Sequence, residues 1–172
     1  MKMRVPSIPL INIDPYFSVW SHDDLNTKDC VHWTGSRNTI IGTVIIDGQN
    51  YRFLGKSTDP VIPQTDIQID ALSTRVTFTN AKIRLTALFT SPTVATDLYY
   101  ASRPVAYLKL SWESADGNAH ATKFTEKHKS NTVAAATAVL VRTGDLFCPF
   151  TRVFFGFIAN ASIHKSKTQS DR

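Results

Sequence analysis

The sequence predicts an all-β protein with an antiparallel β-sandwich and a poorly ordered or irregular C-terminal tail. Whether the sandwich has all its strands is left open by the sequence. Three observations carry this prediction: apolar and polar residues alternate over short runs, turn residues separate those runs, and no apolar stripe of helical spacing occurs before residue 122. Short strands joined by frequent turns are typical of antiparallel sandwiches and barrels. We expect one domain of ordinary size, since the chain has 172 residues.

The first strands are predicted from β-branched and aromatic runs. Residues 16–20 form one such run and residues 39–46 form a second. The second run leads into a turn at Gly48 and then into residues 51–54, so we predict a hairpin with a loop of about four residues. Residues 55–63 contain two prolines and are predicted to be a loop.

The clearest alternation lies in the middle of the chain. Residues 73–79 and 83–89 read as an antiparallel hairpin, with a buried face formed by Thr74, Val76, Phe78, Ile83, Leu85, Ala87 and Phe89. Residues 104–113 read as a further strand, with an inward face formed by Ala106, Leu108, Leu110 and Trp112. These side chains are the predicted core.

The character of the sequence changes after residue 122. Residues 1–122 carry 11 basic and 11 acidic side chains, whereas residues 123–172 carry 8 basic and 3 acidic ones, which is the whole net charge of +5. We therefore divide the chain into a sandwich region, 1–122, and an atypical basic tail, 123–172, that need not be natively folded. Within the tail, the Ala-rich run 133–141 fits either a helix or a buried strand.

Composition excludes several classes of protein. With 42% hydrophobic and 19% charged residues the chain is not intrinsically disordered. No apolar run approaches the ~18 residues of a membrane-spanning helix, and we expect no membrane partner. The basic charges of the tail are scattered and no nucleic-acid-binding motif accompanies them, so we expect no nucleic acid. Polar residues and prolines interrupt the apolar stretch after Arg4, and we identify no signal peptide.

The sequence offers little that could act as a catalytic or metal site. Cys30 and His32 could form an activated thiol, but alternate residues of a strand share a face without sharing a hydrogen bond. Asp23, Asp24 and Asp29 could bind a calcium ion, although a solvated acidic loop explains them better without a calcium-loop glycine. The histidines show no zinc spacing. We therefore predict no catalytic residue, no metal and no cofactor.

Five segments, taken in order, resemble the N-terminal region of the glutaminase A-type proteins of fungi and bacteria. They are DPYFSVW at 14–20, VHWTG at 31–35, IIDGQNYRFLG at 45–55, FTSP at 89–92 and SRPVAYL at 102–108. The resemblance covers roughly residues 5–120. It implies a β-sandwich that precedes a large helical domain, in a family that hydrolyses glutamine to glutamate and ammonia and is often secreted. The expected partner of this chain is that helical domain, which the chain itself lacks.

The resemblance also implies a role. Because the chemistry of the family is expected mainly in the helical part, we expect this chain to be a non-catalytic scaffold, inactive by itself, whether as a truncated product or as a short paralogue. Four residues within the resembling segments are candidates for a surface that docks the helical domain or lines its cleft: Tyr16, Trp20, Trp33 and Arg103. The alternative is a carbohydrate-binding or adhesion module, which would need an exposed row of aromatic side chains on one sheet face.

Overall fold

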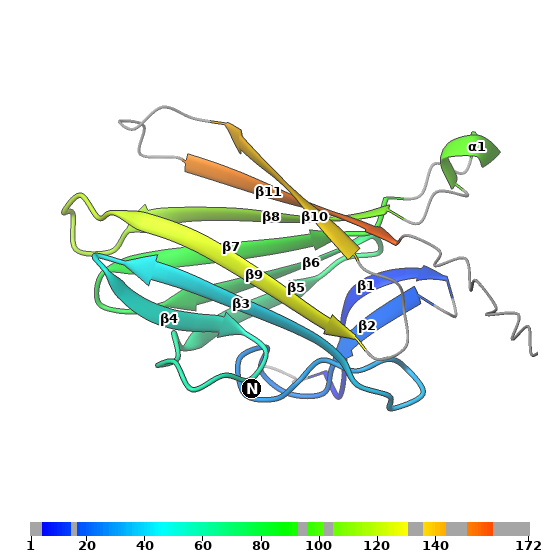
Figure 1. Cartoon of the computed structure of the whole chain (residues 1–172), viewed down its shortest axis with the longest axis horizontal. Helices are drawn as coiled ribbons and strands as arrows, with labels where there is room; N and C mark the ends of the chain where they lie inside the picture. The colour runs from blue at the N-terminus through cyan, green and yellow to red at the C-terminus, as the bar shows by residue number, and fades with distance from the viewer. Residues whose placement is uncertain are drawn as a thin grey trace, which may run out of the picture.

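The protein is a β-sandwich with an additional two-stranded ribbon at one end (Figure 1). The computed structural model describes residues 5–14, 17–92, 96–101, 105–130, 136–143 and 151–159. Within these residues the strands pair antiparallel in three sheets, and the helical content is one turn, α1 (Leu98–Ala101). The predicted fold class, an all-β antiparallel sandwich, is confirmed.

One layer is a six-stranded sheet with the order β10-β11-β8-β7-β6-β5. Its bounds are β5 (Gln64–Ile69), β6 (Ser73–Thr79), β7 (Ile83–Thr90), β8 (Val105–Ser114), β10 (Ala136–Thr143) and β11 (Thr151–Ala159). Its centre is the β6–β7–β8 meander, in which Val76 pairs with Ala87 and Ala87 with Leu110. The predicted inward faces are observed: all the predicted core residues of β6, β7 and β8 are buried except Trp112, which packs against the core while partly exposed.

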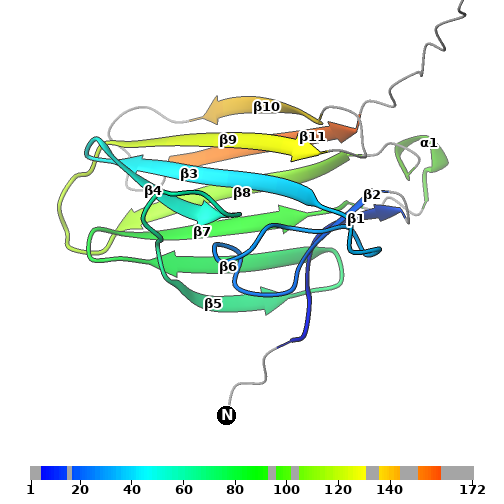
Figure 2. The ribbon, with the colours of Figure 1, turned by 60° about the horizontal axis from the view of Figure 1, so that its bottom comes forward.

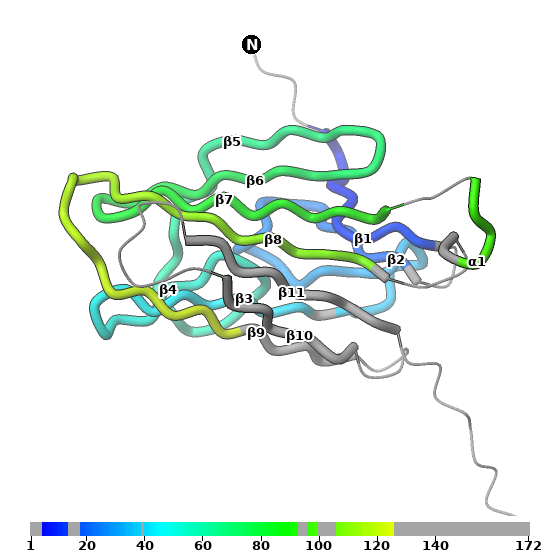
Figure 3. Tube along the Cα trace, turned by 90° about the horizontal axis from the view of Figure 1, so that it is seen from above, coloured from blue at the N-terminus to red at the C-terminus, as the bar shows by residue number. Residues whose placement is uncertain are grey.

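The other layer is a three-stranded sheet with the order β4-β3-β9. It contains β3 (Asn38–Ile46), β4 (Gln49–Leu54) and β9 (Thr122–Ser130). The predicted β3–β4 hairpin is confirmed, but its loop is only Asp47-Gly48, both with positive φ, which is a tighter turn than predicted. Figures 2 and 3 show how β3 and β9 lie over the six-stranded sheet.

The ribbon consists of β1 (Ile8–Asp14) and β2 (Phe17–Ser21). It is joined to the three-stranded sheet through Val31, which bridges Trp20 on one side and Arg37 on the other, immediately before β3. Its inner side chains, among them Leu10, Ile11 and Val19, are buried in the common core. The ribbon therefore closes the end of the sandwich that the three-stranded sheet leaves open.

The two main sheets meet through a cluster of aromatic rings. Phe53 of β4 packs edge-on against Phe78 of the opposite sheet, with ring centroids 6.0 Å apart, and against Phe124 of β9 at 6.3 Å. Trp112 of β8 lies 4.8 Å from Phe124. These contacts fix the distance between the layers.

The outer edge of β4 is covered by the chain that follows it. Residues 55–63 form the predicted loop, which folds back so that Arg52 donates its amide to Pro60 O at 2.7 Å and accepts from the Ile62 amide at 3.0 Å. At the start of this loop, Gly55 has a φ of +72° and donates its amide to Leu25 O at 2.7 Å. The backbone of the edge strand β4 therefore forms hydrogen bonds with this loop instead of with another strand.

Four strands were not predicted: β1, β5, β9 and β11. Strands β1 and β5 contain polar residues at positions where a half-buried strand would carry apolar ones, and β5 is an edge strand whose side chains are mostly exposed. Beyond residue 121 the chain contributes β9, β10 and β11, and the Ala-rich run includes a strand, the second of its two predicted alternatives. The division into regions 1–122 and 123–172 stays a prediction.

Candidate functional site

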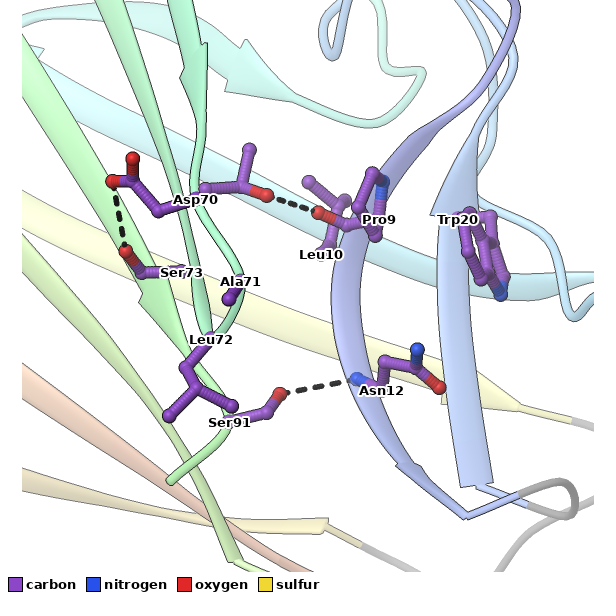
Figure 4. Close-up of a pocket in the computed structure, with 10 residues that line it drawn as sticks. Pro9, Leu10, Asn12, Trp20, Asp70, Ala71, Leu72, Ser73 and Ser91 are labelled. Carbon is purple, nitrogen blue, oxygen red and sulfur yellow. Dashed lines mark hydrogen bonds between the residues drawn. The ribbon is translucent and has the colours of Figure 1, made fainter. Parts of the chain in front are cut away.

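The candidate site is a groove between the ribbon and the turn that joins β5 to β6 (Figure 4). It has a volume of about 130 Å³. Its apolar lining is Pro9, Leu10, Trp20 and Leu72, and its polar lining includes Asn12, Asp70, Ser73 and Ser91. A groove of this volume and mixed chemistry can accept one or two side chains of another polypeptide.

Hydrogen bonds between distant parts of the chain hold the two walls together. The Thr74 hydroxyl donates to Pro9 O at 2.6 Å, and the Asn12 amide donates to the Ser91 hydroxyl at 3.0 Å. The Ser91 amide in turn donates to Leu72 O at 3.0 Å. Since both walls are tied to strands of the sandwich, the groove is built into the fold.

Trp20 brings an aromatic ring to this groove. It lies on β2, where its amide donates to Val31 O at 2.7 Å and its carbonyl accepts from the Val31 amide at 2.9 Å. Its neighbours Val19 and Ser21 are buried, whereas Trp20 is half-buried. Trp20 therefore lies on the face of β2 opposite Val19 and Ser21, and its backbone pairs with Val31, two residues before Trp33.

Trp33 stands on a tight turn and is 62% exposed. The turn is closed by the His32 amide, which donates to Ser36 O at 2.8 Å, and by the Gly35 amide, which donates to His32 O at 2.9 Å. Gly35 has a φ of +86°, a conformation that glycine adopts readily. The His32 ring contacts the Thr34 hydroxyl at 2.9 Å and lies 5.5 Å from the Trp33 ring. The turn therefore holds its backbone in place and presents a large apolar side chain at the surface.

The other two candidates, Tyr16 and Arg103, lie outside the described residues. Of the remaining two, Trp20 lines the groove and Trp33 is exposed on the turn after Val31, so a common docking surface stays a prediction. Sequence reasoning missed the opposite wall of the groove, formed by the β5–β6 turn and Ser91. Leu72, 50% exposed in that turn, was the available signal, because turn residues are usually polar.

More apolar side chains are exposed at this end of the sandwich. Leu98 and Tyr99 of α1 are 82% and 64% exposed, and Tyr107 near the start of β8 is 46% exposed. Tyr107 pairs with Thr90 of β7, which pairs with Ser73 next to Leu72. The ribbon end thus carries most of the exposed large apolar side chains of the described chain.

The Cys30–His32 pair does not form an activated thiol. Cys30 is fully buried, and burial raises the pKa of its thiol to about 12. A thiol that holds its proton at neutral pH is a poor nucleophile. His32 is engaged with Thr34, as described above. Cys30 is therefore part of the core.

The acidic loop after β2 is paired with basic side chains. Asp23 lies 3.1 Å from Lys28, and Asp29 lies 3.6 Å from Arg37. Asp24 accepts a hydrogen bond from the Gln64 amide group at 3.3 Å. Across the residues that the structure describes, no group of three or more His, Cys, Asp and Glu side chains is arranged to hold a metal ion.

None of the helices among the described residues has the length and apolar character that crossing a membrane requires.

Comparisons with known proteins agree with the resemblance seen in the sequence. Residues 1–63 match a domain of unknown function (DUF4964), and residues 72–139 match a second one (DUF5127). Over 127 residues the chain is 27% identical to glutaminase A of Aspergillus oryzae, which covers 68% of this chain and 18% of that relative. The chain thus spans less than a fifth of the length of this curated relative. No solved structure matches the chain. The similarity supports a distant relation between this chain and a region of glutaminase A.

Proposed function

We propose that this glutaminase-related β-sandwich is a non-catalytic scaffold that docks a helical domain of a glutaminase-like protein. The observation that carries the proposal is the exposed Trp33, on the turn that begins after Val31, the residue that pairs with Trp20 of the groove. The similarity to a small part of glutaminase A supports it, because the activity of that relative belongs to a much longer protein. Tyr16 and Arg103, which lie outside the described residues, are the further candidates that the sequence gives for this surface.

Docking would be favourable because it removes exposed aromatic surface from water. Tryptophan is the residue most enriched among interface hot spots, since it buries a large area at a small cost in side-chain entropy. Hydrogen bonds within the turn hold the backbone around Trp33 in place, which reduces the backbone order lost on binding. Lys28 and Arg37, 67% and 78% exposed, provide the charged rim that such interfaces have.

Docking is tested with Trp33→Ala. The probe is the part of Aspergillus oryzae glutaminase A outside the matched segment, made as a separate polypeptide, with binding followed by calorimetry. We expect the wild-type chain to bind and Trp33→Ala to weaken binding by roughly tenfold or more. Val61→Ala, which shortens an exposed apolar side chain in the loop after β4, outside the groove and the ribbon, is the control and should bind like wild type. Equal affinities of wild type and Trp33→Ala would contradict the docking role of Trp33.

The second part of the proposal concerns activity. We expect the purified 172-residue chain to release no ammonia from glutamine above a buffer blank, because the Cys30 thiol is buried and protonated and His32 is bonded to Thr34. Glutamate formation, measured by a coupled enzymatic assay, gives an independent reading. Turnover that survives repeated purification and scales with protein concentration would overturn the non-catalytic assignment.

The alternative, a carbohydrate-binding module, requires a row of exposed aromatic side chains. Trp33 is exposed, but its partner Trp20 is half-buried in the ribbon. One exposed ring beside a narrow groove fits a polypeptide better than a flat sugar chain. Saturable quenching of tryptophan fluorescence by oligosaccharides, abolished in Trp33→Ala, would favour this alternative over docking.

A further inference from the structure

At the end of the sandwich away from α1, His120 lies between two carboxylates. Its Nδ1 is 2.9 Å from Asp47 Oδ2, and its Nε2 is 2.9 Å from Asp116 Oδ1. Asp47 also accepts a hydrogen bond from Lys82 Nζ at 2.8 Å. We refer to Asp47, Lys82, Asp116 and His120 as the ionic clasp.

The clasp joins three connections of the chain. Asp47 lies in the β3–β4 turn, Lys82 in the β6–β7 turn, and Asp116 and His120 in the loop from β8 to β9. The two sheets are thereby linked, since Asp47 belongs to the three-stranded sheet and Lys82 to the six-stranded one. Backbone bonds follow the same path: the Asp47 amide donates to Ala121 O at 3.0 Å, and the Ala121 amide donates to Asp47 Oδ1 at 3.2 Å.

The chemistry of imidazole makes this arrangement sensitive to protonation. A neutral imidazole has one N–H, so it can donate to one of the two carboxylates only. An imidazolium has two, and each can form a charge-assisted bond to its own carboxylate. Both distances are those of hydrogen bonds, and the His120 side chain is only 10% exposed. With both carboxylates ionised, this geometry suits the protonated ring, which can donate to each of them.

We propose that the ionic clasp is a pH-sensitive device that holds the β8–β9 loop on both sheets at mildly acidic pH and releases it as the pH rises and His120 loses its proton. The groups that face His120 are Asp116 from its own loop, Asp47 from the β3–β4 turn and, through Asp47, Lys82 from the β6–β7 turn. Tyr51 of β4 is the further titratable group near Lys82. The proposal is independent of the docking role.

The direction of the pH dependence follows from the charges. The hydrogen bonds to Asp116 and then to Asp47 raise the pKa of His120 above its ordinary value of 6.5. A raised pKa in the folded state stabilises the fold fully below pH 6.5, and this contribution is lost as the pH rises through the folded-state value.

The two carboxylates set the lower limit of the pH range in which the clasp stabilises the fold. Lys82 and then His120 lower the pKa of Asp47 from 3.8 to about 2. The Asn118 amide and then His120 lower the pKa of Asp116. Groups with lowered pKa stabilise the fold above 3.8 and lose that effect as the pH falls toward 2. The contribution of the clasp to the stability of the fold is thus fully present between about pH 4 and pH 6.5.

The test is an NMR titration of the histidine rings of the full chain, with amide exchange of Ala121 measured alongside. We expect the His120 ring to titrate above the ordinary value of about 6.5. The protection factor of the Ala121 amide should fall roughly fivefold or more over that titration. Asp116→Asn, which keeps the shape of the side chain, should lower the titration midpoint of His120 and should flatten the alkaline loss of thermal stability.

His22 provides the matched control, since its Nδ1 contacts the Ser7 hydroxyl at 3.0 Å rather than a carboxylate. His22→Gln should retain the alkaline fall in Tm, whereas His120→Gln should lack it. A His120 ring that titrates at or below the ordinary value, or an Ala121 amide equally protected on both sides of the titration, would overturn the proposal. The titration of the wild-type chain tests the proposal even if a variant fails to fold.

Discussion

Replacing Phe53 with alanine is expected to lower the free energy of unfolding by about 3–5 kcal/mol. Phe53 is 1% exposed and stands in the middle of the sandwich, where its ring contacts Phe78 of one sheet and Phe124 of the other. Removing it leaves a cavity between two rigid layers that cannot collapse to fill the space. Urea unfolding followed by fluorescence and circular dichroism measures the loss. Arg75→Ala, on the exposed face of β6, is the control and should change stability by less than about 0.5 kcal/mol.

The same ring explains why β3 has a glycine in its interior. A Cβ placed on Gly42 would lie 2.5 Å from the tip of the Phe53 ring, which covers Gly42 across a shift in the β3–β4 register. Gly42→Ala should therefore destabilise the wild type, yet cost little once Phe53 is alanine. Equal effects of Gly42→Ala in both backgrounds would show that the two positions are uncoupled.

The second large effect is expected from Gly55→Ala, which should cost about 3 kcal/mol or more. Gly55 has a φ of +72°, and a Cβ there would lie 2.2 Å from the carbonyl oxygen of Ile40. Backbone cannot move aside as a flexible side chain can. The substitution should also disturb the hydrogen bond that the Gly55 amide donates to Leu25 O, which ties the loop after β2 to the end of β4.

Gly48→Ala separates the two causes of that loss. Gly48 also has a positive φ, +82°, but a Cβ there would meet nothing within 4 Å. Its substitution should cost about 1–2 kcal/mol, the price of the left-handed conformation alone. The difference between the two variants in urea unfolding then measures the clash with Ile40. If Gly55→Ala lowered the free energy of unfolding no more than Gly48→Ala does, the close approach of Ile40 in β3 to Gly55 would be disproved.

The sequence could predict strands because burial leaves a period of two in it. The β6–β7–β8 meander can be predicted for this reason, and so can the β3–β4 hairpin with its Asp-Gly turn. The strand β5 cannot be predicted in this way, because an edge strand with exposed side chains does not need to alternate apolar and polar residues. The strand β1 begins near prolines and carries polar residues, so only its place against the core shows that it is a strand.

The candidate site could be predicted only in part. Aromatic side chains suggested Trp20 and Trp33, but nothing local shows that Thr74 binds the carbonyl of Pro9 and so places the β5–β6 turn opposite Trp20. The ionic clasp was missed for the same reason. His120, Asp47 and Lys82 belong to three separate turns, and a single histidine in a turn carries no signal until the topology brings carboxylates to both its nitrogens.

The pairing of β3 with β9 has a consequence during synthesis of the chain. Ile46 pairs with Thr122 and Asn38 with Ser130, so β3 emerges from the ribosome roughly eighty residues before its partner. At typical rates of elongation this delay lasts about 4–16 s, far longer than hairpin formation. In that interval the β3–β4 hairpin exists while Ile40, Val44 and Ile46 have only part of their final cover. The nascent chain is then most exposed to chaperones and to aggregation, and substitutions on the buried face of β3 should reduce yield in cells more than stability alone would suggest.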